Sequence, residues 1–288
     1  MLAVIAGRGE LPAVVAGAVD TALICTLEGT EPDRVPVEFA FRVETLGTVL
    51  NDLAARGVSE VCFCGAVARP ALDPALIDAA TMPLVPVFMQ ALGQGDDGAL
   101  RAVVSIFEDK GFTVRGAHDI APELLPRPGV LTRTQPGAGA EADVAVALQV
   151  LEEMGQQDLG QACVIREGIV IAREVESGTD AMLASVALSM PEGAEAVDPD
   201  GGASGTVLDQ ISAARTHNAP NSGLLFKAPK PGQDRRIDLP TIGPATAMGA
   251  ARAGLDGIVI EAGGVMVLNL PQVIEILDMM GMYLWVRP

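Results

Sequence analysis

Hydrophobic residues in the first half of the chain form short apolar runs that alternate with longer amphipathic stretches. Short runs bounded by glycine are typical of buried strands, and apolar positions repeated every three or four residues are typical of helices. The predicted strands are residues 2–6, 22–27, 61–64 and 112–117, and the predicted helices are residues 12–19, 45–56 and 97–110. This alternation favours a mostly parallel sheet covered by helices, as in a Rossmann-like domain.

The second half begins after a stretch of Pro and Gly without periodicity, at residues 134–142. Such a stretch predicts a linker, so we expect an N-terminal domain at 1–133 and a C-terminal domain at 143–288. Glu167-Gly168 between two apolar runs predicts a hairpin, and residues 191–205 predict a surface excursion. The predicted strands are residues 163–165, 169–173, 224–228, 258–261 and 283–286, and the predicted helices are residues 143–154, 180–190, 241–253 and 271–280. The second domain is therefore also expected to be α/β or α+β.

Composition narrows the classes of function. The 288 residues include 19 Lys and Arg against 37 Asp and Glu, which gives a net charge of −18. A strongly negative protein repels nucleic-acid phosphates, and an aromatic content of only 3% argues against a stacking surface for bases. The chain opens with an apolar strand rather than a basic leader and has no apolar run of membrane-spanning length, so we expect a cytoplasmic protein. The four cysteines are expected to be buried thiols.

Two glycines and an arginine follow predicted strands of the first domain. Gly7 and Gly9 stand between a strand and a helix, where backbone N–H groups could cradle a phosphate or simply form a tight turn. The third glycine of the dinucleotide fingerprint is replaced by Pro12, which argues against a standard NAD site. Arg69 follows the strand at 61–64 and could clamp a phosphate or be a surface arginine.

Carboxylates and a hydroxyl gather between a predicted strand and a predicted helix of the second domain. Glu174, Thr179 and Asp180 could supply oxygen ligands for Mg²⁺. The alternative is that Thr179 or Asp180 caps the helix.

A basic loop at residues 227–243 is the most informative segment. Two lysines and two arginines concentrate there in an acidic chain, and prolines stiffen the loop. Basic groups such as Lys227 and Lys230 beside Asp234 and Asp238 suit a phosphate ester with a bound metal. His118 and His217 lie in different predicted domains, so a zinc site or a histidine-based triad is poorly supported.

Taken in order along the chain, these motifs resemble the LpxI-type UDP-2,3-diacylglucosamine pyrophosphatases of lipid A biosynthesis. The matching segments are residues 6–12, Gly65 with Arg69-Pro70, residues 97–118, Gly178 to Met182, Lys227 to Gly243, and Glu261 to Gly263. Two departures are Ser177, where the family usually has a glutamate, and a longer segment at 191–205.

The resemblance implies Mg²⁺-dependent hydrolysis of UDP-2,3-diacylglucosamine to UMP and 2,3-diacylglucosamine 1-phosphate (lipid X), with the lipid in a cleft between two domains. The residues expected to catalyse are Asp238, Asp180 and Gln233, and the expected metal ligands are Asp238, Asp180 and Glu174. The residues expected to bind substrate are Gly7, Gly9, Arg69, Thr179, Lys227, Lys230, Thr241 and Glu261.

The expected partners are the lipid-nucleotide substrate, the cytoplasmic face of the inner membrane through a transient contact at an apolar rim, and a second copy in a homodimer, but not nucleic acid. Two other functions stay open. One is a protein that binds an acylated sugar phosphate or nucleotide without cleaving it. The other is a nucleotide-dependent oxidoreductase, suggested only by the strand–glycine–helix opening.

Overall fold

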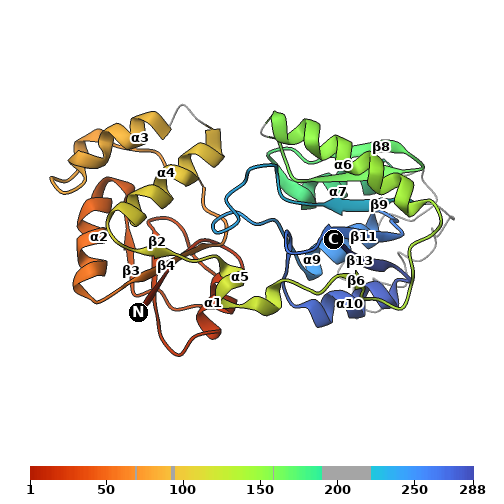
Figure 1. Ribbon diagram of the computed structural model, residues 1–288, viewed down its shortest axis with the longest axis horizontal. Coiled ribbons are helices and arrows are strands. Elements are labelled where there is room, and N and C mark those ends of the chain that lie inside the picture. Colours follow the sequence, from red (N-terminus) through yellow and green to blue (C-terminus); the bar gives the residue numbers. More distant parts are fainter. Residues whose placement is uncertain (69, 92–94, 158, 190–221) are drawn as a thin grey trace, which may run out of the picture. The chain divides into compact units, whose positions relative to one another are not determined.

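The computed structural model describes residues 1–68, 70–91, 95–157, 159–189 and 222–288 (Figure 1). They form two compact units, and the first consists of Met1–Leu124 with Gln233–Leu239. The second consists of Leu125–Gly232 with Pro240–Pro288. Residues 125–133, which the sequence placed ahead of a linker at 134–142, thus belong to the second unit, and the chain passes between the units three times.

The first unit contains a five-stranded sheet in which every neighbouring pair is parallel. Its order is β3-β2-β1-β4-β5, with β1 at Leu2–Ala6, β2 at Ala22–Leu27, β3 at Phe39–Phe41, β4 at Glu60–Cys64 and β5 at Thr113–Val114. All five residues of β1 are buried, as its continuous apolar run predicts for a central strand covered on both faces. The parallel α/β class expected for this half is confirmed.

Helices and short 3₁₀ turns connect these strands. They are α1 at Leu11–Gly17, η1 at Val43–Thr45, α2 at Leu46–Ala55, η2 at Pro74–Leu76, η3 at Met82–Leu84, α3 at Val85–Ala91, α4 at Gly95–Asp109, α5 at Ala117–Ile120 and η4 at Pro122–Leu124. The strand predicted at 112–117 ends early, because Ala117 already begins α5. Thr45 precedes α2 as predicted, but its hydroxyl bonds to the carbonyl of Arg42 instead of capping the helix.

The strand order changes direction between β1 and β4, and the loops after these two strands are paired to each other. The N–H of Gly7 donates to the carbonyl of Cys64 (2.8 Å), and Arg8 and Ala66 exchange two backbone hydrogen bonds (2.8 and 2.9 Å). A Cβ on Gly7 would lie 2.4 Å from the carbonyl carbon of Gly65. Close packing at this edge therefore requires both glycines.

The second unit contains a six-stranded mixed sheet in the order β6-β13-β11-β9-β7-β8. These strands are β6 at Gly129–Val130, β7 at Ala162–Arg166, β8 at Ile169–Arg173, β9 at Leu224–Lys227, β11 at Gly257–Glu261 and β13 at Tyr283–Arg287. Strands β9, β11 and β13 are parallel, and the outer strands pair antiparallel with their neighbours. A separate parallel pair joins β10 at Thr241–Ile242 to β12 at Met266–Val267.

Helices cover both faces of this second sheet (Figure 1). They are α6 at Ala140–Gln156, α7 at Gly178–Leu188, α9 at Pro244–Arg252 and α10 at Leu270–Met279. Within β9, Leu224 and Phe226 pack in the same core as α6, whereas Leu225 packs in the core formed with α7, α9 and α10. Alternate residues of a strand point to opposite faces, which explains why the whole strand is buried.

The hairpin predicted at Glu167-Gly168 is confirmed. The two residues have φ angles of 51° and 75° and join β7 to β8 in antiparallel pairing. Positive φ at both central residues is the requirement of a type I′ turn, whose twist matches that of the flanking strands.

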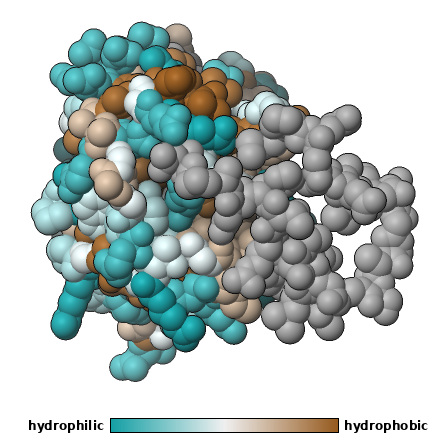
Figure 2. Space-filling view, turned by 90° about the vertical axis from the view of Figure 1, so that its right-hand side faces the viewer, coloured by the Kyte–Doolittle hydropathy of each residue, from teal (hydrophilic) through white to brown (hydrophobic). Residues whose placement is uncertain are grey.

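Exposed large apolar side chains gather in short stretches of the sequence in both units. In the first unit most of them fall between positions 67 and 89, and in the second unit Ile169, Ile171 and Val175 lie within seven residues. In the view of Figure 2, hydrophobic residues form one group near the top and are mixed with hydrophilic residues elsewhere. Within the part of the chain that the structure describes, no helix has the length and apolar character needed to span a bilayer. The surface excursion predicted at 191–205 lies outside the described residues.

Gly65→Ala is expected to destabilise the protein more than Gly57→Ala. The two glycines have φ of +90° and +77°, but a Cβ on Gly65 would lie 2.7 Å from the Gly7 carbonyl carbon, whereas nothing lies within 4 Å of a Cβ on Gly57. Left-handed backbone costs an alanine about 1–2 kcal/mol at either position, and overpacking adds about 1–3 kcal/mol at Gly65. Denaturant unfolding followed by circular dichroism measures the difference, and equal free energies of unfolding would contradict it.

Candidate functional site

Several predicted site residues lie at one edge of the sheet in the second unit. Lys227 ends β9, and Glu261 ends the neighbouring parallel strand β11. Ala162 at the start of β7 pairs with Lys227, and its carbonyl accepts a hydrogen bond from the N–H of Glu174 (2.9 Å). The strand register thus brings Glu174, Lys227 and Glu261 to the same edge, where open α/β sheets commonly bind ligands.

A buried network joins Glu174, Thr179 and Lys227. The Lys227 Nζ donates to the Thr179 hydroxyl (2.8 Å), and that hydroxyl donates to Glu174 Oε1 (2.6 Å). The second carboxylate oxygen, Oε2, accepts the backbone N–H of Gln161 (2.6 Å). All three side chains are buried. Buried charged groups need partners of this kind, so the network fixes the position of the lysine.

Helix α7 begins next to this network. Its N-cap residue is Ser177, which makes no side-chain capping bond, and Thr179 uses its hydroxyl in the buried network. Asp180 is exposed in the first turn of the helix. The capping alternative for Thr179 is therefore wrong, and the structure gives this residue a bridging position between a carboxylate and an ammonium group.

The loop after β9 is packed closely, as its prolines predict. A Cβ on Gly264 would lie 2.8 Å from the Pro229 Cδ and 2.6 Å from the Glu261 Oε1. The carboxylate of Glu261 thus lies against the backbone of Gly264, beside the start of the loop. Lys230 is half-buried in this loop.

The next part of the basic loop, Gln233–Leu239, packs with the first unit. The Gln233 side chain is buried, and its Nε2 donates to Asp238 Oδ2. Two residues predicted to take part in catalysis are therefore hydrogen-bonded to each other. Ile237 between them packs against the core of the first unit.

An arginine holds the same segment in place. The Arg236 guanidinium bonds to both carboxylate oxygens of Asp234 (3.0 and 2.7 Å) and to Glu108 Oε1 on α4 (2.6 Å). Hydrogen bonding to Arg236 lowers the pKa of the Asp234 carboxyl group. Asp234 thus pairs with Arg236, which also binds Glu108 on α4, whereas Asp238 pairs with Gln233.

The remaining predicted residues lie elsewhere. The N–H of Gly7 donates a hydrogen bond to the carbonyl of Cys64, and Gly9 has φ of +95° with open space beside it. Thr241 is half-buried in β10 of the second unit. Arg69 lies outside the described residues. The substrate-binding roles of these four residues stay predictions.

The predicted metal ligands come from both units. Asp238 belongs to the first unit, and Asp180 and Glu174 belong to the second. Among the side chains described, no three His, Cys, Asp or Glu residues are grouped as a metal site would require. Both oxygens of Glu174 accept hydrogen bonds, which suits a residue that positions Thr179 and Lys227.

Sequence reasoning missed the residues that hold Glu174. The backbone N–H of Gln161 bonds to the carboxylate, and a Cβ on Gly160 would lie 2.5 Å from its Cγ. Both residues stand in a short connection before β7 without motif or periodicity, so only the strand order reveals their position.

Family models match the two parts of the chain separately. The LpxI N-terminal domain matches residues 1–124, and the LpxI C-terminal domain matches residues 127–285. The UDP-2,3-diacylglucosamine pyrophosphatase LpxI of Caulobacter vibrioides is 38% identical over 290 residues, which cover 98% of this chain and 95% of that protein. The chain belongs to the LpxI family. The N-terminal LpxI match ends where the first stretch of the first unit ends, whereas residues 233–239 match the C-terminal LpxI domain but pack in the first unit.

Thr179→Val is expected to destabilise this LpxI protein by about 1–3 kcal/mol, because it leaves Glu174 and Lys227 without their shared partner. Thr179→Ser is the matched control, since it keeps the hydroxyl and removes only a methyl group at a cost of about 1 kcal/mol. Urea unfolding measures both free energies. Equal values for the two variants would show that the bridge contributes nothing to stability.

Proposed function

We propose that this chain hydrolyses the pyrophosphate bond of UDP-2,3-diacylglucosamine in lipid A biosynthesis. The products would be UMP and 2,3-diacylglucosamine 1-phosphate. The observation that carries the proposal is the similarity to the Caulobacter LpxI pyrophosphatase over nearly the full length of both proteins. The match of both LpxI domains in their order supports it.

The positions of several side chains support the same chemistry. In the proposed reaction a water oxygen attacks a phosphorus atom, and the bond from that phosphorus to the bridging oxygen breaks. Negative charge on the phosphate oxygens then needs cationic partners. Lys227 is held at the sheet edge by Thr179, which suits it to bind such an oxygen, and Lys230 and Arg69 would contribute further positive charge.

We assign to Asp238 the role of activating the attacking water or binding the metal ion. Its carboxylate is oriented by Gln233, which restricts the rotamers it can adopt. A fixed carboxylate can accept a proton from water or bind a cation. Thr241 and Glu261 would complete substrate binding, together with Gly7 and Gly9 of the first unit.

We extend the proposal to Mg²⁺, which prefers carboxylate oxygens together with substrate phosphates. Asp238 and Asp180 would hold the ion, and the bound ion would neutralise charge on the phosphate groups. We assign Glu174, the third expected ligand, mainly to positioning Thr179, because both of its oxygens already accept hydrogen bonds.

The location of the reaction follows from its substrate. Two acyl chains partition into a membrane, because each buried methylene contributes about 0.8 kcal/mol. We therefore propose that a cytoplasmic protein reaches its substrate by transient contact with the cytoplasmic face of the inner membrane. The homodimer and the ligand cleft between the domains stay predictions.

Purified protein is expected to release UMP from UDP-2,3-diacylglucosamine with Mg²⁺, and EDTA is expected to stop the release. Asp238→Ala should lower kcat by about 10²–10⁴, the range associated with a positioned acid or base, while the variant retains the fold with a melting temperature lowered by the loss of the hydrogen bond from Gln233. Asp234→Asn is the matched control in the same loop, since Asp234 pairs with Arg236 instead. Chromatography of the nucleotide product measures the rate.

Two results would oppose this assignment. Near wild-type turnover by Asp238→Ala would remove Asp238 from the chemistry. Tight binding of the lipid nucleotide by the wild type without any UMP release would favour the non-catalytic alternative.

Lys230→Ala and Arg69→Ala are each expected to lower kcat/KM about 10- to 100-fold, because a charge-assisted hydrogen bond contributes about 1.5–3 kcal/mol. Lys110→Ala, an exposed lysine after α4, is the control and should have little effect. Initial rates at limiting substrate test this prediction. Unchanged values for both variants would remove phosphate binding from their assignment.

A further inference from the structure

Residues 72–89 of the first unit, here called the apolar segment, expose large hydrophobic side chains. Met82 and Met89 are 58% and 65% exposed. The other exposed large apolar residues in the segment are Leu72, Leu76 and Val87. Several such side chains close together in sequence differ from the single exposed hydrophobic residues that any surface carries.

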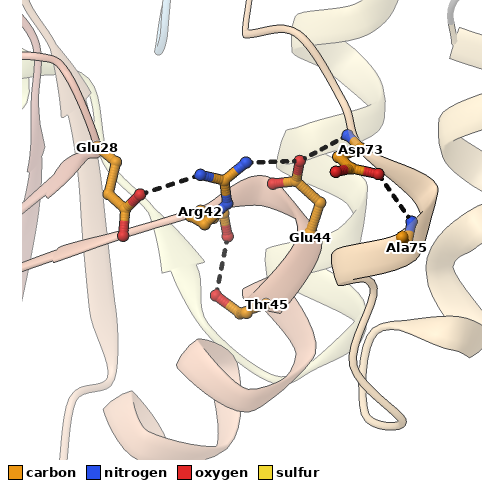
Figure 3. A network of polar contacts seen from close by, with 6 residues as sticks. All are labelled: Glu28, Arg42, Glu44, Thr45, Asp73 and Ala75. Atoms are coloured by element: carbon orange, nitrogen blue, oxygen red, sulfur yellow. Dashed lines mark hydrogen bonds and ion pairs between the residues drawn. The ribbon is translucent and has the colours of Figure 1, made fainter.

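Buried polar groups anchor the first end of the apolar segment (Figure 3). The N–H of Asp73 donates to Glu44 Oε1 (2.8 Å), and Arg42 Nη2 donates to the same oxygen (3.2 Å). The Glu44 side chain is buried. Asp73 in turn accepts the N–H of Ala75 (2.9 Å) and so caps η2. The chain is thus held firmly where the exposed residues begin.

A second anchor lies in the middle of the apolar segment. The fully buried Thr81 hydroxyl accepts the N–H of Gly47 (2.8 Å), and a Cβ on Gly47 would lie 2.1 Å from the carbonyl oxygen of Ala80. Leu84 and Phe88 pack against the core of the first unit. Because these residues occupy the inner side, Met82, Val87 and Met89 are left on the outer side.

The outer side of the apolar segment has few polar groups that would need hydrogen-bond partners. Pro83 and Pro86 are exposed and have no backbone N–H, and the turns of η3 and α3 pair backbone groups within the segment. Residues 79–91 contain no Asp, Glu, Lys, Arg or His, although Asp73 and Asp78 precede them and the chain carries a charge of −18. This part of the surface can therefore approach anionic headgroups that repel an acidic protein elsewhere.

These features suit hydrocarbon better than a protein partner. Protein interfaces are enriched in methionine as well as in aromatic and arginine side chains, and a hydrogen-bonding rim surrounds them. The outer side of the apolar segment shares only the methionines with such interfaces, because Pro83 and Pro86 have no backbone N–H and residues 79–91 have no charged group to form a polar rim. We propose that the apolar segment docks on a phospholipid bilayer and places Met82, Val87 and Met89 among the acyl chains. The inference rests on the proposed function, since a diacylated substrate brings the protein to that surface.

The test is co-sedimentation of the full chain with vesicles of phosphatidylethanolamine and phosphatidylglycerol. Wild-type protein is expected to bind, and Met82→Asp/Met89→Asp should lower the vesicle-bound fraction about tenfold or more, since charged residues are excluded from the acyl region. The matched control is Leu148→Asp/Ile169→Asp, which adds the same charge at exposed apolar positions of the second unit and should bind like the wild type.

A second measurement does not depend on the folding of the aspartate variant. The four native cysteines are buried, and burial raises the pKa of Cys25 and Cys163 to about 12, so an engineered surface cysteine can be labelled selectively. A polarity-sensitive fluorophore on Met82→Cys should shift its emission to the blue when vesicles are added. The same fluorophore on Leu148→Cys should not shift.

Three outcomes would overturn docking on the bilayer. They are the absence of vesicle binding by the wild type, equal binding by the two aspartate variants, and a change from dimer to monomer in Met82→Asp/Met89→Asp, which would make the segment a self-association surface.

UMP release from substrate dispersed in excess detergent is measured in parallel. If the wild type releases no UMP in detergent, the proposed function is refuted. If it releases UMP normally but does not bind vesicles, only the docking surface is refuted.

Discussion

Neighbouring parallel strands carry their carboxyl ends to the same edge of a sheet, and both units are organised by this constraint. In the first unit the ends of β1 and β4 meet so closely that Gly7 and Gly65 leave no room for a side chain. In the second unit the same constraint gathers Lys227 and Glu261 at one edge. One edge is therefore closed by backbone pairing, and the other presents charged side chains.

Much of the fold could be predicted because it is encoded locally. The bounds of β1 and β2 follow directly from apolar runs, and the turn at Glu167-Gly168 follows from the backbone requirement of a tight hairpin. Helix α3 was missed because its sequence is apolar on its outer side as well as its inner side. A helix with apolar residues on its exposed side has no amphipathic period, so the pattern of the sequence does not predict it.

The candidate site was predictable as a set of residues but not as an arrangement. Glu174, Thr179 and Lys227 were each singled out from local motifs, yet the hydrogen bonds that join them depend on which strands are neighbours. Strand order is a long-range property that no short window of sequence contains. The same reasoning applies to Ile237, whose packing partners in the first unit lie more than a hundred positions earlier.

The return of residues 233–239 to the first unit has a consequence for synthesis on the ribosome. Ile237 and the Arg236–Glu108 ion pair belong to the packing of the N-terminal unit but are translated after most of the chain. Chains begin to fold from the N-terminus during synthesis. The packing of the first unit therefore stays incomplete until residues 233–239 have been translated. By then most of the second unit has been translated too, so the two units complete their folding at about the same stage of synthesis.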